Sequence, residues 1–519
     1  MFKRIKKVFI SENSIRGASL ILMVTLAASN VLGVIRDHFL AQKIPTDRLD
    51  IYYAAFRFPD LIFNVLILGS IAAAFVPVYS KYIKEKGDKE ANEMAQATIS
   101  VGILVVSVAL VIMFFLMGGL IELLVPNFSP QKKMETVEMA RWLLASPFIF
   151  TLSYFFGGIL NARKRFLAYS IAPLFYNLAI ITGVVLFADK LGVKGVIIGV
   201  ISGAFLHMLI QLPSVLQVGL KPALRFDFTN PGVKRVIKLM IPRAIGLGSN
   251  QILLFAFTCF ASYVPGAIAI YNLTDNIQTV PSVIFGSSLA TAAFPTLSGL
   301  SLNVEKEKDR FASVFIRSIR AALFFLIPST AVIFVLRAQI IRLILGYGFF
   351  GWADTKAASA ALGFFALSVV AQGIIPIIAR SFYAIHDTRT PMKISIVSII
   401  VSIVFGYIFS RQLTLFDSSV AGLALAFSIG SWVNLILLVY YISGKIKIGF
   451  KKIFAYVAMI IVLTLITSVA MQFTKILVSS SFDINRVRYL LLQTILSLAV
   501  GALVYLFLGW LFKIREIRS

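Results

Sequence analysis

Charged side chains occur inside one of the apolar stretches of the chain, and they are the first candidates for chemistry. Arg36, Asp37, Arg57 and Asp60 lie in residues 30–80, within a pair of apolar segments that a short polar break separates. A charge at the centre of a bilayer costs about 2.5–3.5 kcal/mol on insertion scales, so such residues usually face a protein interior or a wet cavity. We therefore expect a polar cavity here, with the other segments as its wall.

Further polar residues repeat at helical spacing, which puts them on one face of a helix. Arg57, Asp60 and Asn64 follow i, i+3 and i+7. A second stripe has residues at i, i+3, i+4 and i+7, namely Asn272, Asp275, Asn276 and Thr279. Because helices that face lipid would not carry such stripes, both favour a cavity.

On the first segment, Asn30 and Asp37 share a face, whereas Arg36 points about 120° away from Asn30 at 3.6 residues per turn. A wide cavity would include both directions, and a narrow groove would not. A second interpretation stays open, in which Arg36–Asp37 and Arg57–Asp60 are structural ion pairs or snorkel to the outer interface. The helical rise puts Arg36 and Arg57 at a comparable level, near the outer boundary.

Two of three other polar positions have two interpretations each. Arg243 follows Pro242 in LMIPRAIGLGSNQ, where proline and glycine predict a bent or interrupted helix. Beside such a break Arg243 would bind an anion or anchor the helix at the inner interface. For His207 we favour a hydrogen-bonded packing residue over a proton relay. The sequence HDTRTP at 386–391 predicts a helix end followed by a turn.

No motif for a nucleotide or a catalytic metal occurs in the sequence. It contains no Walker sequence, no dinucleotide glycine fingerprint and no HExxH. The single cysteine, Cys259, excludes an intrachain disulfide or a cysteine metal cluster. We therefore expect a protein that is not an enzyme and has no cofactor or metal. Energy for transport would come from an ion gradient or the membrane potential.

The composition places the chain among membrane proteins. Of its 519 residues, 59% are hydrophobic and 14% are charged, whereas about a quarter are charged in a typical soluble domain. The mean hydropathy is +0.90. The net charge of +26 fits basic cytoplasmic loops and anionic headgroups better than nucleic acid, which we do not expect as a partner. The sequence predicts an all-α, polytopic membrane protein.

We expect about fourteen membrane spans, each near the length that a bilayer requires. Their predicted limits are 15–41, 50–82, 92–125, 137–160, 168–188, 192–217, 233–263, 266–298, 310–336, 355–384, 392–410, 418–444, 452–476 and 487–513. Lysine and arginine are concentrated in alternate connections. With an even number of spans, this bias predicts that both termini are cytoplasmic.

An internal repeat appears when the halves of the sequence are compared. GSIAAAFVPVYS (69–80) is similar to GSSLATAAFPTLS (286–298), IELLVP (121–126) to IRLILG (341–346), and NARKRFLAYSIAP (161–173) to ARSFYAIHDTRTP (379–391). The nearly constant offset predicts duplicated six-helix lobes in a parallel repeat. The predicted parts are a basic N-terminus (1–14), two lobes (15–220 and 221–445), and two extra helices with a basic tail (446–519).

Several of these motifs resemble the MurJ (MviN-type) lipid II flippase family of the multidrug/oligosaccharidyl-lipid/polysaccharide exporter superfamily. They are LGVIRD (32–37), DIYYAAFRFPD (50–60), AFVPVYS (74–80), LMIPRAIGLGSNQ (239–251) and YAIHDTRTP (383–391). The resemblance implies two lobes around a cationic cavity, with the extra helices forming a lipid-tail groove. It also implies movement of lipid II, an undecaprenyl-diphosphate-linked precursor, from the inner to the outer leaflet of a bacterial plasma membrane.

The resemblance extends to individual residues. The cavity candidates are Arg36, Arg57, Asn30, Asn64, Asp37, Asp60, Arg243, Asn272, Asp275 and Asn276. Structural or gating roles are expected for Asp50, Gly69, Ser70, Pro77, Pro242, Pro295, Asp387 and Pro391. Many family members have cavity arginines where we align Asn30, Asn64 and Asn276, so this cavity should be less cationic. A family-type sodium site is not expected, because predicted helices 7 and 11 lack acidic residues.

Two other functions stay open at this point. The asparagine replacements also fit a flippase for another lipid-linked glycan, or a multidrug exporter of the same superfamily. The reduced arginine set also fits a membrane scaffold that recruits cell-wall synthesis enzymes without transporting anything. Loss of growth on substitution of Arg36 would favour the lipid II flippase, and drug efflux without glycolipid movement would favour the exporter.

Overall fold

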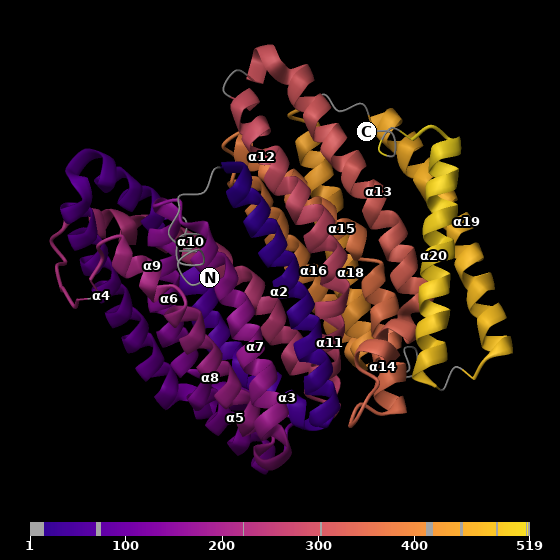
Figure 1. The fold of residues 1–519 in the computed structure, drawn as a ribbon, viewed down its shortest axis with the longest axis horizontal. Helices are drawn as coiled ribbons and strands as arrows, with labels where there is room; N and C mark the ends of the chain where they lie inside the picture. Colours follow the sequence, from indigo (N-terminus) through magenta and orange to yellow (C-terminus); the bar gives the residue numbers. More distant parts are fainter. Residues whose placement is uncertain are drawn as a thin grey trace, which may run out of the picture. The chain divides into compact units, whose positions relative to one another are not determined.

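The computed structural model of the chain describes residues 15–68, 74–221, 223–301, 304–411, 419–446, 450–483, 486–514 and 516. Within these ranges the chain consists of helices and their connections, and no strand occurs (Figure 1). This confirms the all-α prediction. The chain divides into two compact units, Met1–Ala269 and Ile270–Ser519.

The first unit begins with a helical hairpin. It is made of α2 (Ile15–Lys43) and α3 (Thr46–Ile62), and α3 continues into the π-helix η1 (Phe63–Leu68). The remaining helices of this unit are α4 (Val76–Leu124), α5 (Pro130–Leu143), α6 (Ala145–Ala162), α7 (Phe166–Leu191), α8 (Val193–Leu209), α9 (Leu212–Gln217) and α10 (Pro231–Ala261).

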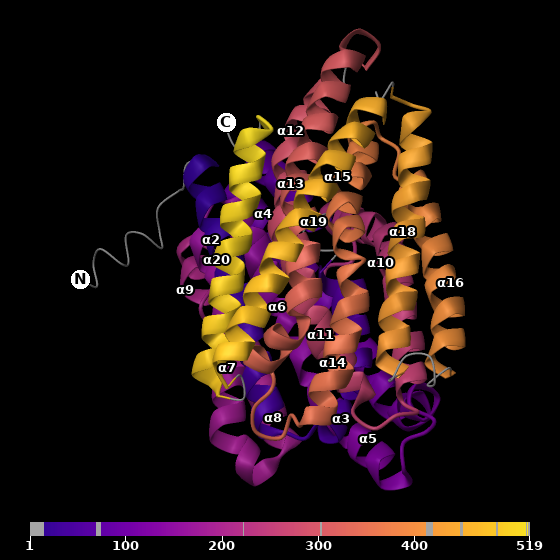
Figure 2. The same cartoon turned by 90° about the vertical axis from the view of Figure 1, so that its right-hand side faces the viewer.

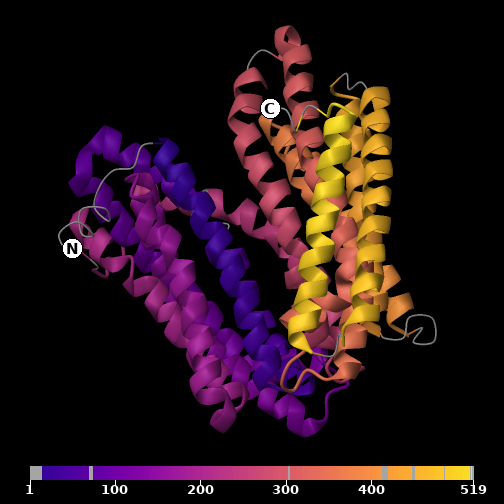
Figure 3. The same ribbon diagram turned by 45° about the vertical axis from the view of Figure 1, so that its right-hand side comes forward.

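The second unit repeats this order of elements. It contains most of α11 (Ala267–Pro281), then the π-helix η3 (Ser282–Ser287), α12 (Ser288–Ser301), α13 (Val304–Ile344), α14 (Trp352–Ala366), α15 (Val369–Ala384), α16 (Arg389–Arg411) and α18 (Ser419–Ser443). The two extra helices follow as α19 (Phe450–Ser481) and α20 (Val487–Leu511). They lie side by side at the end of the chain, drawn in gold and yellow (Figures 1 and 3).

The irregular features of the helices repeat as well. The π-helices η1 and η3 occur at equivalent places in the two halves. Lys164 and His386 follow the ends of α6 and α15, and both have a positive φ, of 58° and 61°. The offsets of these agreements are close to that of the sequence repeat, so the duplication is present in the backbone itself.

Membrane-spanning helices dominate the described part of the chain. Eleven helices there are long and apolar enough to cross a bilayer, or twelve if α14 and α15, bent by 42° at their junction, form one span. The chain is therefore a polytopic membrane protein. The count of about fourteen stays a prediction.

Local sequence signals explain where several helices start and stop. Ser129 caps α5 by accepting a hydrogen bond from the Lys132 N–H at 3.3 Å, and Pro130 opens the helix. Gly87 has φ 84° and interrupts α4, inside the gap predicted between the second and third spans. Only glycine adopts this conformation at low cost, so a turn forms there without a long loop.

Glycines also permit the tight packing of α7 against α8. A Cβ atom built on Gly183 would lie 2.6 Å from the Cα atom of Gly199. Gly195, Gly199 and Gly203 recur every four residues on α8, which is the small-residue pattern of closely approaching membrane helices. This pairing holds α7 beside α2, where it supplies a side chain to the site described below.

Helix α10 belongs to the first compact unit, where it packs against α4, η1 and α3. Our predicted lobe boundary at 220/221 instead grouped this helix with the second half. The assignment of lobes remains a prediction, because the compact units describe packing and not ancestry.

Candidate functional site

The α2–α3 hairpin positions the charged residues that the sequence singled out. Arg36 and Asp37 lie on α2, and Arg57 and Asp60 lie on α3, a short connection apart. The connection is tight because Pro45 precedes α3 and the Ile44 N–H bonds back to the Leu40 carbonyl at 3.1 Å. The short connection then leaves the four charges in one region of the first unit, where Asp60 lies within electrostatic reach of both arginines.

Arg36 is held from two sides. Its Nη2 and Nε atoms lie 2.8 and 3.0 Å from Oδ1 of Asp37, and its Nη1 donates to Oδ1 of Asn177 at 3.3 Å. Asp37 is 1% exposed, whereas the Arg36 side chain is 21% exposed. The Arg36–Asp37 ion pair, one of the interpretations of the sequence, is therefore present. The Arg36 guanidinium is its more exposed partner.

Asn177 on α7 was not found from the sequence. Its amide donates to the Ser29 hydroxyl at 3.3 Å and to the Pro173 carbonyl at 3.3 Å, which leaves its carbonyl oxygen directed at Arg36. A lone asparagine in an apolar helix was the only signal, and its partner lies 141 residues away in the chain.

Arg57 is the more deeply buried of the two arginines, at 8% exposure. Its Nε donates to the hydroxyl of Thr258 on α10 at 2.8 Å, and that hydroxyl donates to the Leu254 carbonyl at 2.7 Å. Thr258 was also missed from the sequence. It fixes the stem of Arg57 from a third helix.

Both arginines act on the same carboxylate. Asp60 lies within electrostatic reach of Arg57 and Arg36. Tyr53 lies within reach of both arginines as well, and Tyr52 within reach of Arg36 and Asp60. We name Arg36, Arg57, Asp60, Tyr52 and Tyr53 the arginine cluster. It joins residues of two helices, of which α3 with η1 is long and apolar enough to cross a bilayer.

The arginine cluster contains one polar group that is ready for a ligand. The hydroxyl oxygen of Tyr53 is buried and has no hydrogen-bond partner among the described residues. A buried hydroxyl without a hydrogen-bond partner costs free energy, so a ligand that supplies an acceptor or a donor would lower this cost. Tyr53 has the right chemistry to hydrogen-bond a phosphate or sugar oxygen.

The two asparagines of the first unit use their amides locally. Asn30 donates to the Leu26 carbonyl at 3.1 Å, and Asn64, in η1, donates to the Asp60 carbonyl at 2.9 Å. Both side chains are half-buried. These bonds leave the side-chain carbonyl oxygens as the groups that could accept from a ligand.

The polar stripe of α11 lies in the second unit. Asn272, Asp275 and Asn276 are half-buried, and Oδ1 of Asp275 accepts from the Gln278 amide at 2.8 Å. The Gln278 carbonyl oxygen in turn accepts from Gln372 at 3.0 Å. The stripe is thus part of a hydrogen-bonded network beside the α14–α15 bend. Its convergence with Arg36 stays a prediction.

Asp50 has a capping role that its sequence position did not reveal. Its fully buried carboxylate accepts from the backbone N–H groups of Gly266 at 2.7 Å and Ala269 at 2.9 Å, at the start of α11. Lys132 on α5 lies 3.1 Å from the same carboxylate and 2.5 Å from Asp47. Asp50, on α3, therefore accepts hydrogen bonds from the free N–H groups at the start of α11 and pairs with Lys132 of α5.

The remaining predicted positions have simpler surroundings or lie outside the described part. Pro77 opens α4, Pro295 lies within α12 and Pro391 lies in the first turn of α16. Gly69 and Ser70 lie outside the described residues. Pro242 and Arg243 lie within α10, but their side chains are also outside the described part, so the anion-binding interpretation of Arg243 stays a prediction.

Asp387 closes the turn between α15 and α16, as HDTRTP predicted. Its carboxylate accepts from the Thr390 N–H at 3.0 Å, the Thr390 hydroxyl at 2.7 Å and Lys445 at 2.5 Å. Partial burial would raise the pKa of the Asp387 carboxyl, but the bonds from Lys445 and Thr390 outweigh it and lower the pKa to about 2. The turn is held by a charged clamp at neutral pH.

His207 is a packing residue in this structure. It is 6% exposed, its Nδ1 lies 2.6 Å from the Ser153 hydroxyl, and its ring stacks on Tyr154 with centroids 5.7 Å apart. Within the described residues no group of three histidine, cysteine or acidic side chains could hold a metal ion.

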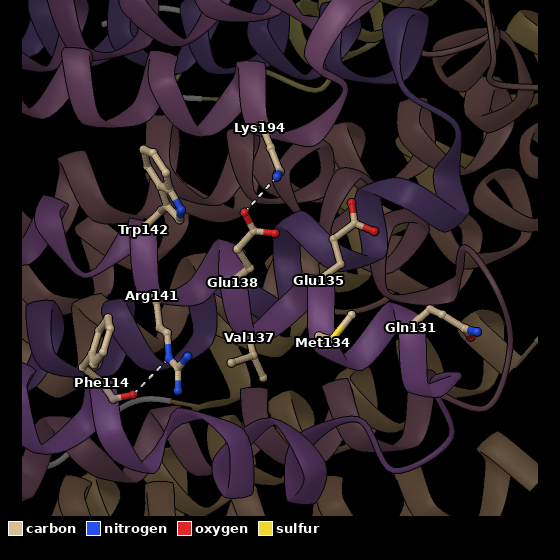
Figure 4. Close-up of a pocket in the computed structure, with 9 residues that line it drawn as sticks. All are labelled: Phe114, Gln131, Met134, Glu135, Val137, Glu138, Arg141, Trp142 and Lys194. Carbon is tan, nitrogen blue, oxygen red and sulfur yellow. Dashed lines mark hydrogen bonds and ion pairs between the residues drawn. The ribbon is translucent and has the colours of Figure 1, made fainter.

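An open pocket of about 860 Å³ lies elsewhere in the first unit, along α5 (Figure 4). Figure 4 shows Glu138 paired with Lys194 at 2.8 Å and Nε of Arg141 donating to the Phe114 carbonyl at 3.2 Å. Both basic groups thus have partners, and Glu135 adds a second carboxylate to the lining. This pocket is poorly suited to a diphosphate, which leaves the arginine cluster as the better anion site.

Comparison with known proteins gives a consistent result. A family model described as lipid II flippase MurJ matches residues 46–493. A probable lipid II flippase MurJ of Rhizobium meliloti is 30% identical over 428 residues, covering 79% of this chain and 77% of the relative. The lipid II flippase MurJ of Burkholderia cenocepacia is 26% identical over 426 residues, covering 79% and 80%.

Solved structures agree at the level of the fold. A lipid II flippase MurJ in an inward closed conformation matches with a TM-score of 0.77 at 24% identity, over 96% of this chain and all of that one. An inward-facing multidrug resistance MATE family transporter of the MOP superfamily matches with a TM-score of 0.66 at 15% identity, over 81% and 97% of the chains.

Proposed function

The chain belongs to the MurJ family of lipid II flippases, and we propose that it moves lipid II across the membrane with the arginine cluster as its headgroup site. The observation that carries this assignment is the pair of arginines from α2 and α3, which lie within electrostatic reach of one carboxylate, that of Asp60. A diphosphate cannot cross hydrocarbon unaided, and guanidinium groups bind phosphate oxygens through paired hydrogen bonds.

Two carboxylates stabilise the arginines of the cluster before the substrate binds. Asp37 and Asp60 balance the charges of Arg36 and Arg57, which lowers the cost of two guanidiniums within the membrane. An incoming diphosphate competes with these carboxylates and leaves each arginine with a partner. We propose that the Tyr53 hydroxyl and the side-chain carbonyl oxygens of Asn30 and Asn64 bind the uncharged parts of the headgroup, since the hydroxyl has no partner among the described residues and the amides bond locally.

Movement of the headgroup requires two states of the protein that bind it differently. A ligand shifts such an equilibrium only as far as its affinities for the two states differ. We propose that Asp50 stabilises one of these states, because its carboxylate ties the start of α11 to α3 and, through Lys132, to α5. Release of this cap would free α11 to move.

The family assignment carries further proposals about the setting. The protein acts as a transporter and not as an enzyme, in a bacterial plasma membrane with both termini in the cytoplasm. The hydrocarbon tail of the substrate stays in the bilayer while the headgroup passes. The ion gradient or membrane potential drives the cycle, and cell-wall synthesis enzymes use the product on the other side.

Substitution of Arg36 by alanine tests the assignment in cells. Arg36→Ala should abolish growth of a strain depleted of its own lipid II flippase, because Asp37 stays buried while the phosphate loses its guanidinium. Membrane levels of the variant should be unchanged. The matched control is Arg48→Ala on α3, since Arg48 is exposed and paired with Glu135 outside the cluster. Full growth with Arg36→Ala would overturn the assignment of the site.

A substrate-resolved assay separates this function from that of the MATE-like exporters. In vesicles, the wild-type chain should move lipid II and not small cationic drugs. Drug efflux without movement of lipid II would overturn the proposed substrate even if Arg36 proved essential.

A further inference from the structure

A groove between α13 and α19 lies apart from the arginine cluster, within the second unit. It measures about 930 Å³. Its long apolar section is lined by Ile327, Phe334, Ile461, Leu465, Val469 and Phe473. The sequence resemblance implied a lipid-tail groove on the two last helices, but it implied nothing about charge there. Figure 2 shows α13 and α19 in the second unit.

Cations line one end of this groove. Arg337 and Lys475 are both half-buried, and both face the groove from opposite helices. They lie within electrostatic reach of each other. No acidic residue lines the groove, and neither cation forms an ion pair within the described part of the chain. Two like charges in such surroundings repel each other unless an anion lies between them.

Each of the cations is fixed in position. Nη1 of Arg337 donates to the Phe334 carbonyl at 2.9 Å, and Nζ of Lys475 donates to the Val335 carbonyl at 3.1 Å. The Arg337 side chain crosses Gly363 of α14, where an added Cβ would lie 3.1 Å from its Cδ atom. The backbone therefore leaves room for this arginine, which is a feature of a built site.

A buried amide network holds the same region of the bundle together. Gln339 on α13 donates to Gln493 on α20 at 3.1 Å, and Gln493 donates to the Lys475 carbonyl at 2.8 Å. These bonds tie three helices at the level of the two cations. The spacing between Arg337 and Lys475 is thus set by the bundle and not by flexible loops.

The length of the groove matches one leaflet. Its residues extend from Ile327 to Ala338 on α13 and from Ile461 to Ile476 on α19, which correspond to about 16 and 22 Å of helix at 1.5 Å per residue. The hydrocarbon core of a bilayer is about 30 Å thick, so one leaflet takes about half of that. An occupant with an anionic head at the Arg337 end would extend only to the middle of the membrane.

We propose that the α13–α19 groove holds an anionic phospholipid, with its phosphate between Arg337 and Lys475 and an acyl chain along the apolar section. The positive-inside bias places the cationic end at the outer leaflet, because the basic loops precede α13 and α19 at their other ends. This site goes beyond the proposed transport function and does not depend on it. The lipid is a bound partner of the bundle, distinct from the transported substrate.

Native mass spectrometry of the full chain from nanodiscs of defined composition tests this inference. The wild-type protein should retain one phosphatidylglycerol when released from mixed phosphatidylglycerol and phosphatidylcholine. Retention should fall at least tenfold in Arg337→Gln/Lys475→Gln, which removes the head contacts, and in Val469→Trp, which fills the chain slot. Arg337→Lys/Lys475→Arg, which keeps both charges, should restore most of it.

The matched control is Arg488→Gln. Arg488 lies in the first turn of α20, where it stacks on Tyr489 and does not line the groove. This control should retain phosphatidylglycerol as the wild type does. Equal retention by Arg337→Gln/Lys475→Gln would overturn the inference. So would equal binding of phosphatidylcholine, or displacement of phosphatidylglycerol by undecaprenyl diphosphate at equal concentration, which would make the groove part of the substrate site.

Discussion

At the scale of single residues, the arginine cluster depends on groups that hydrogen-bond the guanidiniums and on one hydroxyl, that of Tyr53. Arg36 has Asp37 and Asn177, and Arg57 has Thr258. The Tyr53 hydroxyl is buried without a partner among the described residues. Hydrogen-bonded side chains set the geometry of a site, whereas a buried polar group without a hydrogen bond is able to bind a ligand.

Tyr53→Phe separates a ligand contact from a structural contact. Because the hydroxyl makes no hydrogen bond within the described part, its removal should leave the thermal unfolding temperature unchanged or slightly raised. If it binds the headgroup, lipid II affinity should fall about two- to tenfold, the worth of one hydrogen bond of about 0.5–1.5 kcal/mol. Binding to the purified protein measures this directly, and unchanged affinity would remove Tyr53 from the site.

The Asp387 clamp predicts a dependence of stability on pH. A carboxyl whose pKa is lowered by folding, here to about 2 from about 3.9 in the unfolded chain, stabilises the fold above the higher value. That contribution, about 1 kcal/mol for a pair with an exposed lysine, is lost as the pH falls from about 4 to about 2. Asp387→Asn should therefore unfold at a lower temperature than wild type at pH 7, with the difference vanishing near pH 2.

The measurement is thermal unfolding of the two proteins in detergent across this range. A difference that grows on acidification, or that is absent at pH 7, would contradict the clamp. Asp354→Asn provides a comparison at the start of α14, since Asp354 also accepts a backbone hydrogen bond, from the Gly351 N–H at 2.9 Å.

At the scale of elements, the helices are joined by a few charged contacts far apart in the sequence. Asp50 is the clearest case, since its carboxylate connects α3, α5 and the start of α11. Because it is fully buried, each of its bonds forms in low dielectric and none is exchanged with water. The start of α11 is therefore the element most dependent on a single side chain.

Asp50→Ala should show this dependence. It leaves Lys132 and the N–H groups of Gly266 and Ala269 without their buried acceptor, which should cost about 3–5 kcal/mol. Asp47→Ala is the matched control, because Asp47 binds the same lysine but is 50% exposed and should cost at most about 1 kcal/mol. Hydrogen exchange at α11 should rise in the first variant only, and equal exchange in both would refute the capping role.

Much of the element structure could be predicted, because membrane helices have a strong hydropathy signal. The limits of α7, α16, α19 and α20 lie within a few residues of the predicted ones. The π-helices η1 and η3 were not predicted, since they occur inside continuous apolar sequence without a local signal. The break predicted between the second and third spans lies at Gly87 within α4, where a turn at this glycine takes the place of a longer loop.

The site could be predicted only in part. Arg36, Arg57 and Asp60 were found because charge inside an apolar segment is conspicuous in any sequence. Asn177 and Thr258 were not, because their partners lie 141 and 201 residues away and a single polar residue in a helix has many ordinary roles. Asp50 was expected to be structural or gating, but its capping of α11 depends on backbone groups that no side-chain pattern reveals.

At the scale of the whole molecule, the two halves of the chain repeat the same order of elements but differ in the charged residues they carry. Both halves repeat the same helices and the same π-helix breaks, as expected for transporters built from repeats. The arginine cluster lies wholly in the first unit, and the stripe on α11 is uncharged apart from Asp275. We expect the diphosphate to bind to the first unit.

Movement of fluorescent lipid II across the membrane of proteoliposomes tests this account most directly. Wild type and Arg48→Ala should transport at the same rate. Arg36→Ala and Arg57→Ala should each fall at least about tenfold, the effect of losing one charge-assisted hydrogen bond of about 1.5–3 kcal/mol. Folded Arg36→Ala and Arg57→Ala proteins that transport lipid II at the wild-type rate would contradict the central claim that these arginines bind its diphosphate.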